Sequence, residues 1–373
     1  MKKSARWIPA AAIPVAVIAA GIVVPSMAAS ADVDLPDKTP QQVLALAAGS
    51  SGVAFSGTVE QTSDLGLPDI PSSLQGGSST GESTSDALEM LTGSHTAQVF
   101  VDGEARQRVQ VVDDLSERDV IRDGRDLWSY DSTSKDATHT TLPDASSRDL
   151  PDTLADGTAV PQTPSELADA VLDAVGDTTT VTSSDDVSVA GRDAYRVVLT
   201  PDDADTLVAR ATLTIDAETG VPLAVTVDAR GQDDPAISVA LTSVSFETPA
   251  SSVFEFTPPA DATVTEGAVP AEGREAHGGE HAEPVVIGSG WSTVVGLDGA
   301  TSAAGSAPAD GSASGGDQGD RSALLDQVMT RVDGGRVLQT SLVSIYLGDD
   351  GRVFVGAVDA ETLQAAVASA PAE

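Results

Sequence analysis

The chain contains no cysteine among its 373 residues, and aromatic side chains make up only 3% of it. Disulfide bonds are therefore excluded, and so is attachment of a lipid to an N-terminal cysteine. Stability must come from burial of apolar side chains and from backbone pairing. Because Phe, Trp and Tyr are scarce, any apolar cavity should be lined mainly by Val, Leu, Ile and Ala.

Basic residues are also scarce, with 20 Lys and Arg against 57 Asp and Glu and a formal net charge of −37. Such a chain repels nucleic acid and anionic lipid headgroups, which excludes both as non-specific partners. The charge does not oppose binding of the apolar part of a lipid. Taken alone, it favours solubility outside the cell.

The N-terminus has the pattern of a secretory signal in residues 1–31. Lys2, Lys3 and Arg6 precede an apolar stretch from Trp7 to Val24, and Ala29-Ser30-Ala31 has the small-x-small form that signal peptidase accepts. We therefore expect cleavage after Ala31 and a secreted or otherwise extracytoplasmic protein. The alternative is an uncleaved N-terminal anchor, since the apolar stretch is long enough to span a bilayer.

Two shifts in composition divide the rest of the chain. Residues 260–284 form a charged stretch that predicts a disordered acidic linker, and residues 298–320 are nearly all Gly, Ala, Ser, Asp and Pro. The sequence thus predicts a first domain over 38–259 and a small α+β unit over 285–370, with 298–320 as an internal low-complexity loop.

Two helices should begin with the same capping box, at Thr39-Pro40-Gln41-Gln42 and at Thr163-Pro164-Ser165-Glu166. In each, Thr accepts a hydrogen bond from the backbone three residues on, Pro occupies the first helical position, and Gln or Glu reaches back. Gly49 and Gly176 mark the predicted helix ends.

Between and after these helices the chain alternates apolar and polar residues, as half-buried strands do. Asp102-Gly103 and Asp123-Gly124 predict tight hairpins. A second run of strands is expected over 179–189, 193–200, 208–216, 222–230 and 236–247. The short turns require mostly antiparallel pairing, because a parallel connection needs a long crossover. The fold class is therefore mainly β.

In the C-terminal unit, strands are expected near 285–287 and 291–296, and a helix over 322–332. A hairpin from Ser341 to Val358 and a last helix over 360–369 should follow.

A long loop over 64–94 carries spaced aliphatic residues among Pro, Gly and Ser. A loop of this length is either a flap over a cavity mouth or an ordinary surface excursion. The residues that would form the flap are Leu65, Leu67, Ile70 and Leu74.

No catalytic, metal-binding or cofactor-binding cluster is predicted. His277-Gly278-Gly279-Glu280-His281 has the spacing of an inverted zinc peptidase motif, but that chemistry needs a helix and two glycines occupy the middle. A serine hydrolase triad would have to use His95 or His139, and no nucleophile elbow is present.

Four segments carry a resemblance to a known family: 120–130 with its Trp-x-Tyr hairpin, 193–201, 215–223 and 252–259. Their order after the first capped helix resembles the LolA-like superfamily, which includes the lipoprotein carrier LolA and the N-terminal domain of RseB (MucB). The resemblance covers roughly 38–259. It implies an unclosed antiparallel β half-barrel with capping helices over an apolar cavity, and no enzymatic activity.

Two functions follow from the resemblance. The first is a monomeric, non-enzymatic carrier that holds the acyl chains of a lipid or lipoprotein; the alternative is an RseB-like sensor that binds the extracytoplasmic part of an anti-sigma factor. Each candidate cavity residue also reads as ordinary core. These candidates are Phe55, Val59, Val99, Val109, Trp128, Tyr195, Val197, Leu213 and Val225.

Overall fold

The structure is a computed structural model that describes residues 35–66, 93–113, 116–143, 176, 178–267, 285–297 and 329–370. Several predicted features lie outside the described residues: the signal peptide, the second capped helix before Gly176, most of the long loop, and the histidine pair at 277–281.

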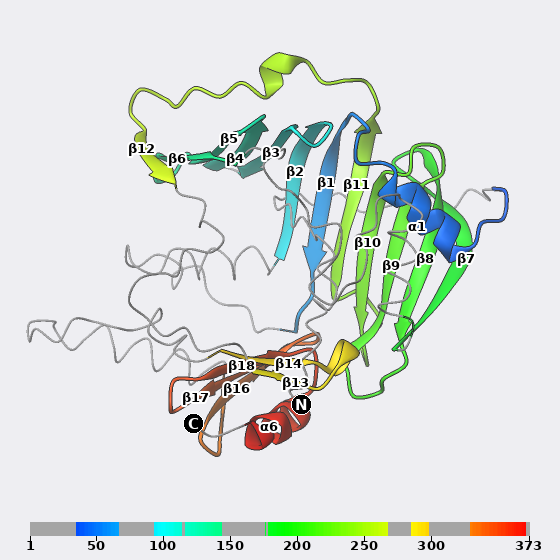
Figure 1. The fold of residues 1–373 in the computed structure, drawn as a ribbon, viewed down its shortest axis with the longest axis vertical. Helices are drawn as coiled ribbons and strands as arrows, with labels where there is room; N and C mark the ends of the chain where they lie inside the picture. Colours follow the sequence, from blue (N-terminus) through cyan, green and yellow to red (C-terminus); the bar gives the residue numbers. More distant parts are fainter. Residues whose placement is uncertain are drawn as a thin grey trace, which may run out of the picture.

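Most of the described chain is β-structure (Figure 1). The first part comprises α1 (Pro40–Ala48), β1 (Phe55–Ser63), β2 (Gly93–Asp102), β3 (Arg106–Asp113), β4 (Ser116–Asp123), β5 (Asp126–Asp131), β6 (Asp136–Thr141), β7 (Thr179–Val189), β8 (Arg192–Pro201), β9 (Val208–Asp216), β10 (Pro222–Ala229), β11 (Ile237–Ser245), η3 (Ser251–Val253) and β12 (Thr263–Gly267). The C-terminal unit comprises β13 (Val285–Ile287), η4 (Gly290–Ser292), β14 (Val294–Leu297), β15 (Thr330–Val332), β16 (Gly335–Gln339), β17 (Ser344–Gly348), β18 (Val353–Gly356) and α6 (Ala360–Ser369).

The first twelve strands form one open sheet in the order β12-β6-β5-β4-β3-β2-β1-β11-β10-β9-β8-β7. Sequential strands are neighbours in two runs, and the pairing of β1 with β11 joins the runs. The sheet is not closed, because β12 and β7 occupy its two edges. Figure 1 shows it bending between β2 and β6. The predicted mainly β class and unclosed antiparallel sheet are thus confirmed.

The first helix begins as the capping box predicts. Thr39 accepts a hydrogen bond from the Gln42 backbone, and the Gln42 side chain accepts one from the Thr39 backbone at 2.9 Å. Pro40 occupies the first helical turn, and Gly49 is the C-cap. Val43 is the helix residue that is fully buried.

The predicted hairpins and the second run of strands are also confirmed. Gly103 and Gly124 adopt positive φ angles of 68° and 62° in the turns after β2 and β4. Between β7 and β8, Ala190 and Gly191 both have positive φ. Two successive left-handed residues give the turn that matches the twist of a hairpin.

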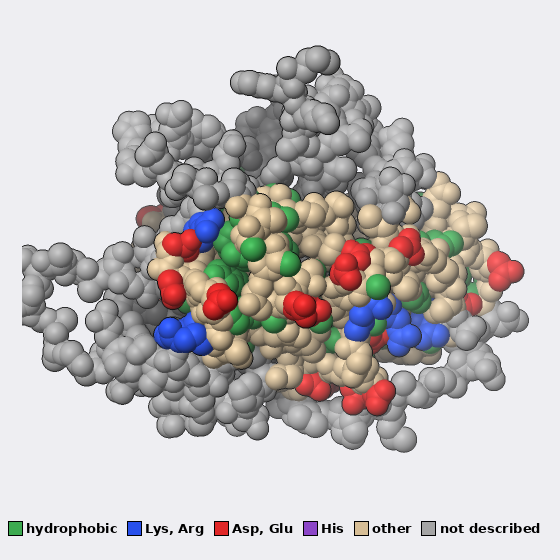
Figure 2. Space-filling model, turned by 90° about the horizontal axis from the view of Figure 1, so that it is seen from below, with side chains coloured by type: hydrophobic (Ala, Val, Ile, Leu, Met, Phe, Trp, Pro, Cys, Tyr) green, Lys and Arg blue, Asp and Glu red, His purple; other side chains and the backbone are tan. Residues whose placement is uncertain are grey.

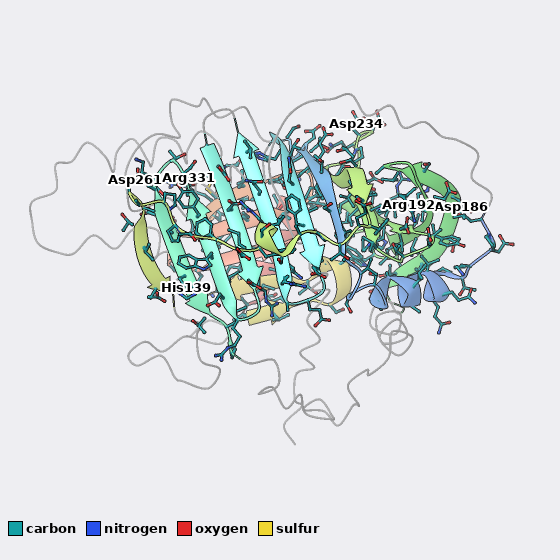
Figure 3. All side chains as sticks on the ribbon, turned by 90° about the horizontal axis from the view of Figure 1, so that it is seen from above. His139, Asp186, Arg192, Asp234, Asp261 and Arg331 are labelled. Carbon is teal, nitrogen blue, oxygen red and sulfur yellow. The ribbon has the colours of Figure 1, made fainter. Side chains whose placement is uncertain are left out.

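Residues 246–262, here called the strap, connect β11 to β12 across the sheet (Figures 1 and 3). The strap packs on β3 to β5, where the Arg108 guanidinium donates to the Val253 carbonyl at 3.1 Å. Beyond it, β12 pairs in parallel with β6. This strand lies within the segment 260–284 that the composition suggests is a linker, and its parallel pairing is an exception to the expected antiparallel pattern.

The C-terminal unit is a six-stranded sheet in the order β13-β14-β18-β17-β16-β15, with α6 packed on it. The prediction of a helix continuing to residue 332 is wrong, because Thr330–Val332 is the strand β15. The Gly334-Gly335 turn folds β15 back onto β16, and pairing between these strands replaces the helix. The last predicted helix is confirmed as α6.

The two units share a junction. Val208, Ala229 and Ala236 of the large sheet pack with Leu342 of the C-terminal unit in one apolar cluster. The Ala357 carbonyl accepts hydrogen bonds from the Leu207 backbone and the Thr206 hydroxyl, both at 2.8 Å. Burial and backbone pairing therefore hold the C-terminal unit against one end of the large sheet (Figure 1).

Candidate binding face

Eight of the nine predicted cavity residues lie on one face of the large sheet, here called the α1 face. Paired residues in an antiparallel sheet point to the same side, so the face can be followed from strand to strand. Val197 pairs with Leu213, Leu213 pairs with Val225, and Val225 pairs with Val239. On the other half of the sheet, Val99 pairs with Val109.

The part of this face on β8 and β9 packs against α1. Tyr195, Val197 and Ile215 are buried there with Val43 of the helix, and Leu213 is partly buried beside them. The Tyr195 hydroxyl donates to the Pro36 carbonyl at 3.1 Å, which fixes the chain just before the helix. Burial raises the pKa of this hydroxyl above its usual value. These contacts hold α1 over the β7–β9 end of the face.

A second apolar cluster lies mainly on β1, β2, β10 and β11. Val59, Val99, Leu223 and Leu241 are buried in it, and the aromatic ring of Phe55 packs at its margin. Three residues of the β7–β8 hairpin also contact this cluster. They are Val187, Val189 and Ala190. The sheet therefore curls far enough for its β7 edge to reach back towards its middle.

The eight residues differ in exposure. Val59, Val99, Tyr195 and Val197 are buried by the chain itself, as core residues are. The other four, Phe55, Val109, Leu213 and Val225, are half-buried. An apolar ligand gains free energy from covering surface that is still exposed, so the half-buried four are the stronger candidates for ligand contact. Whether they line a cavity stays a prediction.

Trp128 is the exception among the predicted residues. It pairs with Ile121 and His139 and lies on the opposite face, here called the strap face. Its ring stacks on His139 with centroids 4.4 Å apart and lies 5.4 Å from the ring of Phe256 in the strap. Tyr130 also contacts Phe256, at 5.7 Å. The structure thus brings Trp128 to the strap and away from the other eight residues.

Leu65 is the one predicted flap residue that lies within the described chain. It packs in the junction cluster, and its carbonyl accepts a hydrogen bond from the Ser341 backbone at 2.9 Å. The Asp64 carbonyl accepts another from the Ser341 hydroxyl at 3.1 Å. The start of the long loop is therefore tied to the C-terminal unit. Leu67, Ile70 and Leu74 lie outside the described residues.

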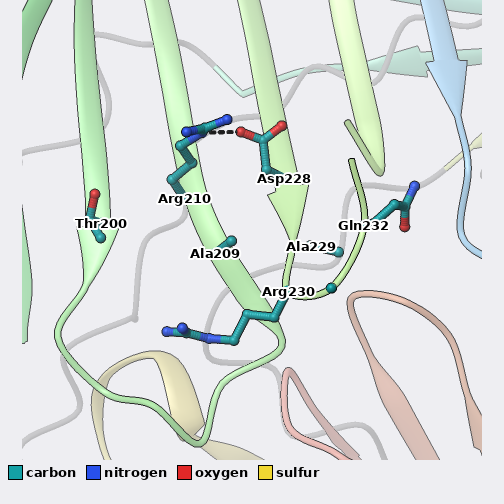
Figure 4. A pocket seen from close by; sticks show the side chains of 8 residues that line it. Thr200, Ala209, Arg210, Asp228, Ala229, Arg230 and Gln232 are labelled. Carbon is teal, nitrogen blue, oxygen red and sulfur yellow. Dashed lines mark hydrogen bonds and ion pairs between the residues drawn. The ribbon is translucent and has the colours of Figure 1, made fainter. Parts of the chain in front are cut away.

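A groove of about 490 Å³ lies on the strap face of β8 to β10 (Figure 4). Arg210 and Asp228 form an ion pair inside it. Arg230 donates to the carbonyls of Thr206 and Asp203, at 2.7 Å and 2.9 Å. A groove with this polar lining does not suit an acyl chain, and it lies on the face opposite to the predicted cavity residues.

Each end of the sheet has a buried carboxylate paired with an arginine. Near the β7–β8 hairpin, Asp216 is fully buried and accepts from Arg192 at 2.8 Å and from Thr219. Burial opposes its ionisation, but the hydrogen bonds from Arg192 and Thr219 outweigh burial, and the pKa of Asp216 lies below its usual value. Near the strap, Asp119 accepts two hydrogen bonds from Arg108, yet burial dominates and raises its pKa.

The two histidines of the described residues lie on opposite faces of the large sheet. His95 pairs with Gln61 on the α1 face, whereas His139 pairs with Trp128 on the strap face. Within the described residues, no three His, Asp or Glu side chains are placed to hold a metal ion.

Figure 2 shows acidic side chains spread over the face that it presents, with basic ones gathered in a few groups.

No protein-family model matches this chain, and no sequence among the curated proteins matches it. Three solved structures illustrate what its fold is similar to. The MucA/MucB complex of Pseudomonas aeruginosa shares 15% identity over 88% of this chain and 96% of that chain, with a TM-score of 0.44. A LolA superfamily protein from Nitrosomonas europaea shares 13% identity over 59% and 99%, with a TM-score of 0.24. A putative outer membrane lipoprotein-sorting protein domain from Vibrio parahaemolyticus shares 10% over 56% and 92%, with a TM-score of 0.17.

An open antiparallel sheet with a helix on one face is what the sequence resemblance implies, and it is the arrangement observed. Within the described residues, no helix combines the length and the apolar character needed to cross a bilayer.

Sequence reasoning missed the contacts of the strap. Phe254 and Phe256 belong to the closing segment of the family resemblance, but nothing in the sequence says which face they cover. The alternation of Trp128 and Tyr130 on β5 is a signal that could have been used, because both residues must point to the same side of the strand.

Proposed function

We propose that this protein is a non-enzymatic, extracytoplasmic binder that holds the acyl chains of a lipid or lipoprotein on its α1 face. The observation that carries the proposal is the largely apolar α1 face from β8 to β3, which holds two apolar clusters and which α1 covers at one end. Gln61 and His95 are polar residues on this face. Each acyl methylene buried there would contribute about 0.8 kcal/mol. Net negative charge elsewhere leaves this contribution unchanged, because it depends on apolar area alone.

The direct test is mass spectrometry of the protein after gentle extraction from its native host, together with uptake of a fluorescent fatty acid. We expect a co-purifying lipid and saturable uptake. Finding neither a bound lipid nor any uptake would overturn the proposal.

Variants locate the binding face. Val109→Thr and Val225→Thr each place a hydroxyl among half-buried apolar side chains while keeping the shape that suits a strand. Both should weaken fatty acid uptake by severalfold. Val264→Thr makes the same change on β12, where the side chain is 50% exposed, and should leave uptake unchanged. Equal loss in all three variants would place the ligand elsewhere.

The second candidate function is that of a regulator which binds the extracytoplasmic segment of an anti-sigma factor. The junction between the two units favours it, because shared burial and backbone hydrogen bonds hold the units together, so that one partner can contact both. Cross-linking in native membranes, followed by affinity purification of this protein, should then recover a single-pass membrane protein. If cross-linking recovers no such partner while lipid uptake is normal, the carrier function stands alone.

A further inference from the structure

His139 lies between two carboxylates that belong to different strands. Its Nε2 is 2.8 Å from Asp126 Oδ1 on β5, and its Nδ1 is 3.2 Å from Glu266 Oε2 on β12. These are the charged groups of β5 and β12 within ion-pair distance of the ring among the described residues. Figure 3 places His139 at the end of the sheet where β12 lies.

A neutral imidazole cannot satisfy both carboxylates. It carries one N–H and one lone pair, whereas the imidazolium donates from both nitrogens. When the ring is neutral, the proton stays on Nε2, which makes the shorter contact, to Asp126. The lone pair of Nδ1 then faces the Glu266 carboxylate, and the resulting repulsion falls on β12.

Apart from its backbone pairing with β6, β12 has few contacts that attach it to the sheet. The side chains of residues 263–266 are exposed, so β12 buries little apolar surface. The ion pair between Lys135 and Asp261 at 2.6 Å is also solvent-exposed. By contrast, the middle of the strap is firmly held, since Phe254 is only 1% exposed and Arg108 binds the Val253 carbonyl. Release would therefore affect the end of the strap while its middle stays in place.

We propose that protonated His139 latches β12 to β6, and that loss of this proton releases β12 and uncovers the edge of the large sheet. A released edge presents unpaired N–H and C=O groups, which can pair with another strand. Hydrogen bonding to Asp126, and then to Glu266, raises the pKa of His139, while partial burial opposes the rise. Stacking on Trp128 also favours the charged ring.

The sign of the pH dependence follows from that raised pKa. The stabilisation of β12 is fully present below the ordinary histidine value near 6.5, and it is lost as pH rises through the raised value. At pH 5.5 most carboxyl groups are still ionised, so between about pH 5.5 and 8.5 His139 is the described side chain in contact with β12 that changes charge.

Hydrogen exchange of the full 373-residue chain tests the latch. Exchange of the β12 amides, normalised to that of β10, should rise about two- to fivefold between pH 5.5 and 8.5, the range that a partly exposed charge pair supports. His139→Gln cannot titrate and should abolish this rise. His95→Gln on β2 is the matched control and should retain it. A normalised β12 exchange rate that does not change with pH in the wild type, or a rise that persists in His139→Gln, would overturn the proposal.

Two further variants separate the latch from a purely structural role. Gly267→Val should release β12 at every pH, because any Cβ at this position would collide with the Thr140 hydroxyl. Glu266→Gln should remove the pH dependence of β12 exchange while His139 still titrates. That titration can be followed by the fluorescence of Trp128 in a Trp7→Phe, Trp291→Phe background. If Glu266→Gln keeps the full pH dependence, repulsion at Glu266 is not the cause of release.

Discussion

The two ends of the large sheet are built from the same kind of strand but are stabilised in different ways. On β8 and β9, Val197 and Ile215 are completely buried, and α1 packs over them. On β4 and β12, Val120 is 48% exposed and Val264 is 50% exposed. This end is held more by contacts with the strap and by charged pairs. The difference indicates that the β8–β9 end depends on buried apolar packing, whereas β12 depends on backbone pairing and charged pairs.

The largest expected effect on stability comes from replacing Val by Ala at each end of the large sheet in turn. Val197→Ala should lower the free energy of unfolding by about 2–4 kcal/mol, because it removes two buried methyl groups and leaves a cavity. Val120→Ala should lower it by less than about 1 kcal/mol, the size of a strand-propensity effect at an exposed position. Urea denaturation measures both. Equal losses would contradict the contrast between the two ends.

The buried ion pairs sharpen the contrast through charge. Asp216→Asn should cost about 2–3 kcal/mol at pH 7, because the ionised carboxylate is the form that Arg192 and Thr219 stabilise. Asp119→Asn should cost about 1 kcal/mol or less, because the burial that raises the pKa of Asp119 offsets part of what its hydrogen bonds from Arg108 contribute. Both values come from denaturation at pH 7.

The pH dependence of these two variants checks the same reasoning. The pKa of Asp216 is lowered, so its stabilisation is present above the ordinary aspartate value near 3.9 and is lost as pH falls through the lowered value. The difference in free energy of unfolding between wild type and Asp216→Asn should therefore become smaller as the pH falls below the ordinary aspartate value. For Asp119 the sign is opposite, since its pKa is raised and its favourable contribution is lost as pH increases. If Asp119→Asn lowers the free energy of unfolding at pH 7 by more than Asp216→Asn does, the directions given for the two pKa shifts are wrong.

A smaller effect is expected where α1 meets the turn before β10. Gly220 has a φ of 79°, and any Cβ there would collide with the carbonyl oxygen of Leu46 at the end of α1. Gly220→Ala should cost about 1–3 kcal/mol and should displace the helix. Gly191→Ala also carries a positive φ, of 75°, but meets open space, and should cost about 1 kcal/mol from backbone strain alone. Thermal unfolding compares the two, and faster amide exchange of α1 should appear only in Gly220→Ala.

Much of the fold could be predicted from local chemistry. The Thr39 capping box and the Asp-Gly turns act over three or four residues, so the sequence alone specifies them. The face shared by Val197, Leu213 and Val225 also follows from alternation along each strand once the pairing is known. What local chemistry does not determine is pairing at long range. Nothing near residues 263–267 says that they pair with β6, and their polar composition suggested a linker.

The same limit explains where the candidate site could not be predicted. Trp128 and Val109 are both large apolar residues on neighbouring hairpins, and sequence alone cannot assign them to opposite faces without the register that pairs Val109 with Val120 and Trp128 with Ile121. The helix expected up to residue 332 failed for a related reason. A short apolar periodicity fits a helix or a strand, and the Gly334-Gly335 turn decided for the strand.

The smallest predicted effect concerns the helix caps, and it tests how much the N-cap contributes to the stability of α1. Thr39→Ala removes the acceptor for the Gln42 backbone, and Asp359→Ala removes the equivalent acceptor for Thr362 at the start of α6. Each should cost about 1 kcal/mol in the stability of its helix. Both helices fully bury one side chain, Val43 in α1 and Leu363 in α6, so amide exchange should rise by a similar factor in each.

If α1 is the element that a ligand must displace to cover Leu213, Thr39→Ala should also change the rate of fatty acid uptake. Asp359→Ala should leave that rate unchanged, and an equal change in both variants would mean that the cap acts through overall stability alone.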